Sequence, residues 1–379
     1  MNSQLSNEQV MIQDMARRFA TDSLLPFTGV WDQDKHFPVD VIRNTAELGF
    51  AGIYVPETVG GSGLGRLDAA LIFEQLAYGD VSTAAFVSIH NMATWMINTF
   101  GNDAQRKAFV GPLTRMELMA SYCLTEPGSG SDAAALKTTA RRDGDHYVLN
   151  GAKQFISGAG VSDIYVLMAR TGGDGAGGIS TFIVPLGTPG LSFGANERKM
   201  GWNSQPTRQV LLDEVRLPVS HRVGEEGQGF KFAMAGLDGG RLNIAACSLG
   251  GAQRALDKAL SYAREREQFG QPLVGFQAVQ FKLADMETEL QAARMMLYEA
   301  ARKLDAAAAD ATRWCAMAKR FVTDTGSKVA NEALQIHGGY GYLHDYGVEQ
   351  IVRDLRVHQI LEGTNEIMRV IISRDMLRD

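Results

Sequence analysis

Glu362 is the acidic residue whose context best suits proton chemistry. It stands in the run Leu361-Glu362-Gly363-Thr364-Asn365, where Gly-Thr-Asn separates two apolar stretches. A carboxylate at such an interruption can face a pocket instead of solvent. Partial loss of water then raises its pKa toward that of a competent base. Glu362 is therefore a candidate catalytic base.

Two upstream segments combine hydroxyls, glycines and an aromatic ring in ways typical of ligand contacts. The stretch 122–132 reads Tyr-Cys-Leu-Thr-Glu-Pro-Gly-Ser-Gly-Ser-Asp. Its glycines let the backbone approach a ligand, and Thr125 and Ser131 supply hydroxyls. The run Phe155-Ile156-Ser157 places a ring beside a hydroxyl. A plain connector for the first segment and a strand with a core Phe for the second are the structural alternatives.

Two downstream segments are candidates for a phosphate-bearing ligand. Arg266, in the charged stretch 264–273, could pair with a diphosphate, although a solvated charged face is the alternative. Pro272 is predicted to open the following helix at its first position. The stretch 335–342 is dense in glycine after a long helical pattern, which indicates a helix cap, a backbone approach site or both.

Other chemistries find little support in the sequence. The seven histidines show no metal-ligand spacing, and Cys123, Cys247 and Cys315 lie far apart, so we expect buried thiols and no metal site. Neither a dinucleotide-binding glycine motif in a βαβ unit nor a Gly-x-Ser-x-Gly elbow occurs. The 37 basic and 43 acidic residues leave a formal charge of −6, which argues against nucleic-acid binding.

The N-terminus carries no pattern of a secretory signal or an Arg-rich transit peptide, and the sequence has no apolar run of membrane-spanning length. We expect no membrane association. The expected location is the cytoplasm, or the mitochondrial matrix if the sequence is that of a trimmed mature form.

The elements that must position these segments change character twice along the chain. Residues 1–120 show helical patterns, beginning with a capping box at Ser6 and a first helix that ends at Pro26. Residues 121–230 show short β-rich runs separated by glycine turns, which favour a small barrel or sandwich. Residues 231–379 are helical again, and an apolar stripe over 276–305 indicates a long helix of a four-helix bundle. The predicted class is α+β multidomain and mainly α.

In this order and spacing, the segments resemble the acyl-CoA dehydrogenase family across essentially the whole chain. The matching runs are 123–132, 266–270, 335–341 and 362–366. The resemblance implies an N-terminal helical domain, a middle β-barrel and a C-terminal four-helix bundle. It also implies bound FAD, an acyl-CoA substrate, an electron-transfer flavoprotein as acceptor, and a homotetramer of paired dimers that share each FAD across an interface.

The resemblance also implies roles for individual residues. Those expected to line the flavin are Tyr122, Leu124, Thr125, Ser131, Phe155, Ile156 and Ser157. Many relatives carry Trp at the position of Phe155. Those expected to meet the adenine and pyrophosphate half of a neighbouring subunit's FAD, or to complete that binding, are Arg266, Gln268, Phe269, Phe276, Gln277, Gln335, Ile336, His337, Gly338, Gly339, Thr364 and Glu366. Those expected on the CoA side are Ser131, Asp238, Gly239, Gly240, Arg241, Gly363 and Arg374.

The implied reaction is removal of the substrate's α-proton by Glu362 with hydride transfer from the β-carbon to flavin N5. A flavin ribityl hydroxyl and the amide of the base itself would hold the thioester oxygen. Gly240 stands where the isovaleryl and long-chain branches carry their base, so those branches are not expected.

The runs 199–208, 238–245 and 336–343 resemble the branch that converts isobutyryl-CoA to methacrylyl-CoA in valine degradation. A short straight-chain or 2-methylbutyryl substrate is the first alternative, because a methylene changes specificity by only about 1–3 kcal/mol. An acyl-CoA oxidase and a non-catalytic CoA-binding scaffold are the others.

Overall fold

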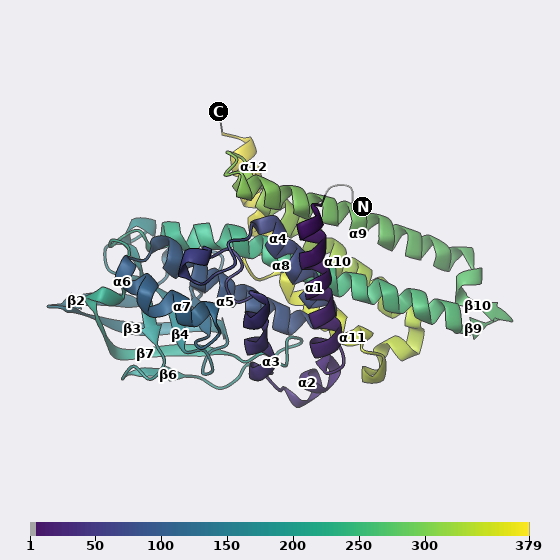
Figure 1. Cartoon of the computed structure of the whole chain (residues 1–379), viewed down its shortest axis with the longest axis horizontal. Helices are drawn as coiled ribbons and strands as arrows, with labels where there is room; N and C mark the ends of the chain where they lie inside the picture. The colour runs from purple at the N-terminus through teal and green to yellow at the C-terminus, as the bar shows by residue number, and fades with distance from the viewer. Residues whose placement is uncertain (1–4, 379) are drawn as a thin grey trace.

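The computed structural model of the chain describes residues 5–378, and its first third is helical (Figure 1). Ser6 caps α1 through the predicted capping box with Gln9, and the helix continues as a π-helical turn over Ala20–Leu24, ahead of Pro26. The predicted cap and end of this helix are therefore confirmed. The helices of this part are α1 Asn7–Phe19, α2 Thr28–Asp34, α3 Val39–Asn44, α4 Arg66–Gly79, α5 Val81–Phe100, α6 Asp103–Gln105 and α7 Gly111–Thr114.

The middle part is an eight-stranded sheet in the order β6-β7-β3-β2-β4-β5-β8, with β1 paired in parallel to β4. The β-rich runs of the sequence, at 146–149, 164–168, 180–184 and 209–212, lie in strands as predicted. Closure of the sheet into a barrel stays a prediction. The strands are β1 Ala120–Cys123, β2 Thr139–Asp143, β3 His146–Ser157, β4 Ile164–Arg170, β5 Ile179–Pro185, β6 Leu191–Phe193, β7 Thr207–Pro218 and β8 Arg222–Val223.

The last part is built on three long helices, and its residues from 277 onward confirm the predicted helical stripe. Leu290, Ala293, Leu297 and Ala301 of α9 are fully buried because their spacing keeps them on one face. The helices are α8 Gly229–Glu265, α9 Gln277–Asp305, α10 Ala311–His337, α11 Val348–Arg356 and α12 Asn365–Met376.

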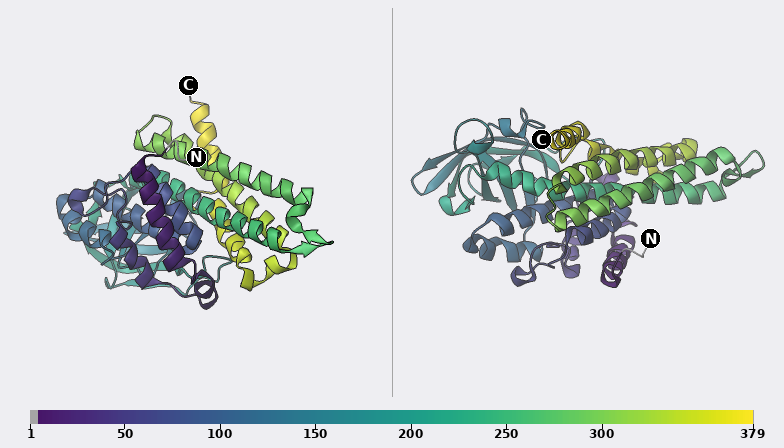
Figure 2. Two further views of the ribbon diagram at one scale, coloured as in Figure 1. Left: turned by 45° about the vertical axis from the view of Figure 1, so that its right-hand side comes forward. Right: turned by 90° about the horizontal axis from the view of Figure 1, so that it is seen from above.

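The sheet occupies one end of the molecule, and the long helices extend from it to the other (Figures 1 and 2). At that far end, β9 (Glu267–Gln268) and β10 (Gln271–Pro272) form a small hairpin between α8 and α9. Pro272 therefore does not open α9, and the prediction that it would is wrong. The hairpin and a 3₁₀ turn over Leu273–Gly275 absorb it, and α9 begins only at Gln277.

We propose domain boundaries near residues 120 and 230, since α7 ends at Thr114 before β1, and β8 ends at Val223 before α8. One core cluster joins the N-terminal helices to the long C-terminal ones, and another lies within the sheet. Cys123, Cys247 and Cys315 are free and buried, as expected, and burial raises the pKa of each thiol.

Over residues 5–378, no helix is both long and apolar enough to cross a membrane. The same part of the chain holds no cluster of His, Cys, Asp or Glu side chains suited to a metal ion.

Candidate active site

A cavity of about 730 Å³ lies where the sheet, α5, α8 and the segment before α12 meet. A volume of this order suits a small-molecule ligand. Eleven of the predicted site residues line it: Tyr122, Leu124, Thr125, Ser131, Phe155, Ile156, Ser157, Arg241, Glu362, Gly363 and Arg374.

A second cavity, of about 570 Å³, shares part of this lining and reaches toward α11. The two cavities thus form neighbouring compartments around the loop that carries Glu362. The predicted site residues in the second cavity are Thr125, Ser131, Phe155, Ser157, Glu362, Gly363 and Thr364.

Glu362 lies on a short loop with unusual backbone geometry. Its φ is +56°, and that of Gly363 is +87°, so two successive residues adopt left-handed conformations. This conformation costs a residue with a side chain roughly 1–2 kcal/mol. The chain leaves it at Thr364, whose hydroxyl accepts from the backbone N–H of Ile367 and caps α12. The left-handed turn places the carboxylate beside the cavities instead of along a helix face.

The carboxylate of Glu362 is buried without a matching donor. Its Oε2 atom is inaccessible to solvent and finds no hydrogen-bond partner within residues 5–378. Burial raises the pKa of Glu362 to about 7, while the charges of Arg241 and Lys319 act in the opposite direction. A carboxylate with a pKa near neutrality can take up a proton and release it again.

Gly240 of α8 leaves the space that this carboxylate occupies. A Cβ atom at position 240 would lie 2.6 Å from Oε2 of Glu362 and 3.2 Å from Sδ of Met92. A side chain there would displace the carboxylate. The position of the Glu362 carboxylate therefore requires glycine at position 240.

Glu126, by contrast, is a buried carboxylate with a structural role. It accepts from the ammonium of Lys153 at 2.7 Å and from the backbone N–H groups of Lys137 and Thr138. Although burial raises its pKa, these contacts hold the pKa below its usual value. Glu126 fixes the loop that presents Thr125 to the cavities.

Phe155 lies in β3, but it is not a core residue. A register shift between β3 and β7 falls beside it, its φ is +59°, and the side chain is 64% exposed. The bulge turns the ring out of the sheet toward both cavities. The structural alternative for this segment was a strand with a core Phe. The segment does lie in a strand, but Phe155 is not in the core.

Among the CoA-side predictions, Arg241 and Arg374 line the larger cavity, whereas Asp238 and Gly239 do not. Asp238 accepts from Arg241 at 2.6 Å and from the hydroxyl of Thr312 at 2.7 Å. Gly239 faces the guanidinium of Arg66. Both residues therefore contact neighbouring side chains and not the cavity.

A third cavity, of about 360 Å³, lies between the ends of α8 and α10. Predicted residues that line it are Arg266, Gln268, Ile336, His337, Gly338 and Gly339. Gly338 has a φ of +58° and ends α10, which confirms the predicted cap.

The remaining members of the adenine-side set do not line this third cavity. Phe269 is 94% exposed and meets Phe276 edge to face. Gln277, Gln335 and Glu366 are exposed on the surface of the helices. The chain thus brings the flavin-side set together with Ser131, Arg241, Gly363 and Arg374 of the CoA-side set. Of the adenine-side set, Thr364 alone among the described residues lines either of the two larger cavities.

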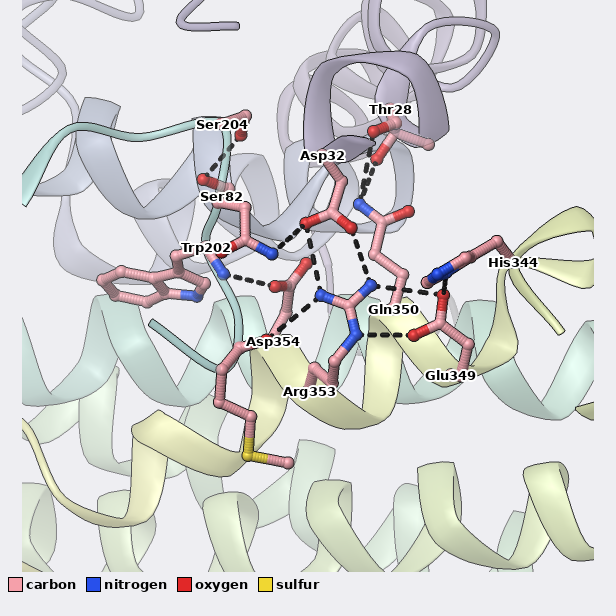
Figure 3. Close-up of polar contacts among 12 residues, drawn as sticks. Thr28, Asp32, Ser82, Trp202, Ser204, His344, Glu349, Gln350, Arg353 and Asp354 are labelled. Carbon is pink, nitrogen blue, oxygen red and sulfur yellow. Dashed lines mark hydrogen bonds and ion pairs between the residues drawn. The ribbon is translucent and has the colours of Figure 1, made fainter. Parts of the chain in front are cut away.

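Trp202 is a wall residue that the sequence did not single out by itself. The residue lines both larger cavities, and its backbone N–H donates to the side chain of Asp354 at 2.5 Å (Figure 3). Burial raises the pKa of Asp354 to about 8. The only sequence signal was its place in the distinctive run 199–208.

The chain has a helical part, a β-sheet part and a second helical part, in that order. Beside two adjoining cavities lies a buried carboxylate oxygen that has no partner within residues 5–378. Residues 6–117, 121–215 and 227–377 match the N-terminal, middle and C-terminal domains of acyl-CoA dehydrogenases. The chain belongs to the acyl-CoA dehydrogenase family and is an oxidoreductase.

Two relatives are mitochondrial isobutyryl-CoA dehydrogenases. The Bos taurus protein is 55% identical and the Dictyostelium discoideum protein 56% identical, and each match spans 99% of this chain and 90% of the relative. The solved structure of butyryl-CoA dehydrogenase from Megasphaera elsdenii is 38% identical, with a TM-score of 0.96 over 100% of both chains. Location in the cytoplasm or the mitochondrial matrix stays a prediction for this chain.

Members of this family are flavoproteins, and the residues around the two larger cavities fit a flavin. Phe155 offers an exposed ring, and Thr125, Ser131 and Ser157 offer hydroxyls. The Oε2 atom of Glu362, which has no partner in the described part of the chain, lies beside them. A planar, hydrogen-bonding ring and an apolar acyl chain are ligands that such a lining suits.

Proposed function

We propose that this protein is an FAD-dependent dehydrogenase that converts isobutyryl-CoA to methacrylyl-CoA in valine degradation, with Glu362 as the catalytic base. The observation that carries the proposal is the buried Oε2 atom of Glu362, which has no partner within the described residues and lies beside both cavities. The identity of 55–56% to isobutyryl-CoA dehydrogenases supports the branched substrate.

In this mechanism the ionised carboxylate of Glu362 removes the α-proton of the thioester and holds it on a carboxyl oxygen. The backbone N–H of Glu362 donates to the thioester oxygen and stabilises the charge that develops there. Apolar side chains such as Met92, Leu237 and Ile244 line the larger cavity, exclude water and surround the short acyl group. Bound FAD supplies the hydride acceptor.

We propose that the flavin-side residues of one subunit and the adenine-side residues of a neighbour hold FAD together in a homotetramer of paired dimers. This assignment is supported by the separation of the third cavity from Glu362's loop and by the exposed Phe269 and Tyr342 on the same helical end. Arg266 and His337 would face the phosphates and adenine, Thr364 and Glu366 would complete that binding, and Arg241 and Arg374 would face CoA. An electron-transfer flavoprotein is the expected electron acceptor.

The test is anaerobic reduction of the bound flavin by a panel of acyl-CoAs at matched concentrations. Isobutyryl-CoA is expected to bleach the flavin fastest, and the rate should rise with pH through about 7 as Glu362 ionises. Glu362→Gln should retain flavin and lose at least about 10³-fold in rate. Bleaching at the normal rate in this variant would exclude Glu362 as the base.

A short straight-chain substrate is the second candidate, favoured by the similarity to butyryl-CoA dehydrogenase. Faster bleaching by butyryl-CoA than by isobutyryl-CoA would establish it. Rapid peroxide formation without an added acceptor would indicate an oxidase. A stable, colourless protein that cannot take up FAD would indicate a scaffold.

A further inference from the structure

Lys319 is a buried lysine behind the loop that carries Glu362. It lies in α10 with a fully buried side chain. Its ammonium donates to the backbone carbonyl of Gly363 at 2.7 Å and to the side-chain carbonyl of Asn365 at 2.8 Å. Both acceptors are uncharged, so these bonds hold the ammonium in place without neutralising it.

The loop is held from two sides by cations on different helices. Arg241 of α8 reaches the carbonyl of Glu362 with its Nε at 3.4 Å, while Lys319 of α10 binds the next carbonyl along the chain at 2.7 Å. These two carbonyls belong to the residues with left-handed backbone. Lys319 makes the shorter contact and also binds Asn365, the first residue of α12. It therefore ties together the loop and the helix that follows.

The position of Lys319 also gives it an electrostatic role. Burial lowers its pKa to about 8, and the charge of Glu362 is the largest influence in the opposite direction. Reciprocally, Lys319 lowers the pKa of Glu362 against the effect of burial. The other groups that act on this pair are Arg241 from α8, Asp324 from α10, Glu366 from α12, and the hydroxyls of Tyr54 and Tyr122.

We propose that Lys319 is a positioning residue for the catalytic base: it holds the Gly363 carbonyl so that Glu362 keeps its left-handed conformation, and its positive charge stabilises the carboxylate form of Glu362. The proposal deepens the function proposed above and rests on Glu362 being the base. Lys319 itself needs no contact with substrate.

Isotope exchange tests the proposal without any hydride transfer. Acetyl-CoA has α-protons but no β-carbon, so the holoenzyme in D₂O can only remove an α-proton and return a deuteron. Mass spectrometry of acetyl-CoA gives the exchange rate as a function of pD. In Lys319→Met, the midpoint of this profile should move up by about one unit, and exchange below the wild-type midpoint should fall roughly tenfold.

Lys319→Gln separates charge from hydrogen bonding, because the amide can donate but carries no charge. It should show the same upward shift with a smaller loss of thermal stability, and it serves as the test if the Met variant does not fold. Lys258→Met is the matched control, since Lys258 also donates to a backbone carbonyl, that of Tyr346, at 2.9 Å. It should lose stability without moving the midpoint.

An unmoved midpoint in a folded Lys319 variant would overturn the proposal and leave Lys319 a packing role. Failure of the proposed function looks different: the wild-type protein would neither exchange acetyl-CoA protons nor lose flavin colour with any acyl-CoA. Exchange that persists in Glu362→Gln would also count against the proposed function, because another group would then be the base.

Discussion

The carboxylates around α11 and the carboxylate on the loop before α12 differ in their hydrogen-bond partners. On α11, Arg353 binds Asp32 at 2.6 Å and Glu349 at 2.5 Å (Figure 3). Asp32 also accepts from Asn203 at 3.0 Å, and Glu349 accepts from His344 at 2.7 Å. On the loop before α12, the Oε2 atom of Glu362 is buried and has no hydrogen-bond donor within residues 5–378.

The comparison separates a structural role from a chemical one. Burial raises the pKa of Glu349, but its contacts with Arg353 and His344 outweigh burial and hold it below the usual value. The pKa of Glu362 instead rises to about 7, although Arg241 and Lys319 oppose the shift. Glu349, paired in this way, stays ionised, and the Asp32–Arg353 ion pair joins α2 to α11. A buried carboxylate without such partners can exchange a proton.

The largest expected effect comes from removing the ion pairs of Arg353 with Asp32 and Glu349. Arg353→Met leaves Asp32 and Glu349 buried without their shared cation, and it should lower the free energy of unfolding by about 3–5 kcal/mol. Urea denaturation measures this loss. Arg356→Met is the control, because Arg356 is exposed and its guanidinium donates only to Gln359 at 3.1 Å among the contacts in this structure. Equal losses in the two variants would contradict the structural role.

A smaller effect is expected from adding a methyl group beside the carboxylate of Glu362. In Gly240→Ala, the added methyl displaces Oε2 of Glu362, and the rate of flavin reduction should fall roughly 10- to 100-fold with little change in stability. Stopped-flow bleaching measures the rate. Gly173→Ala adds the same methyl where no atom lies within 4 Å, so its rate should match the wild type. An unchanged rate in Gly240→Ala would mean that the carboxylate tolerates displacement.

The smallest effect concerns the cap that ends the loop. Thr364→Ala removes the acceptor for the N–H of Ile367 and should cost about 1 kcal/mol of stability, visible as a lower melting temperature. Thr364→Ser retains the hydroxyl and should melt close to the wild type. If both variants lose the same stability, the methyl group of Thr364 matters more than its hydrogen bond.

The local parts of the fold could be read from sequence because short-range rules determine them. The capping box at Ser6, the stripe of α9 and the cap at Gly338 all depend on residues within one or two helical turns. The prediction for Pro272 is wrong because the local sequence is compatible with either a helix start or a hairpin. The hairpin with Glu267 decided between them.

The surroundings of Glu362 depend on contacts between distant segments. Helical patterning assigns a lysine to the surface, so the sequence does not indicate that Lys319 is buried. Its burial depends on the packing of α10 against residues 363–365. Trp202 was equally hidden, since its place at the cavities depends on Asp354 holding its backbone N–H. Sequence could nominate the base, but it could not show which oxygens have partners.

The three buried cysteines have a practical consequence. Thiolate is the form that reacts with maleimides and iodoacetamides, and burial disfavours it at Cys123, Cys247 and Cys315. The native chain should therefore remain unlabelled while folded. A single cysteine introduced at an open position such as Gly173 could then carry a fluorophore or spin label alone, without first removing any natural residue.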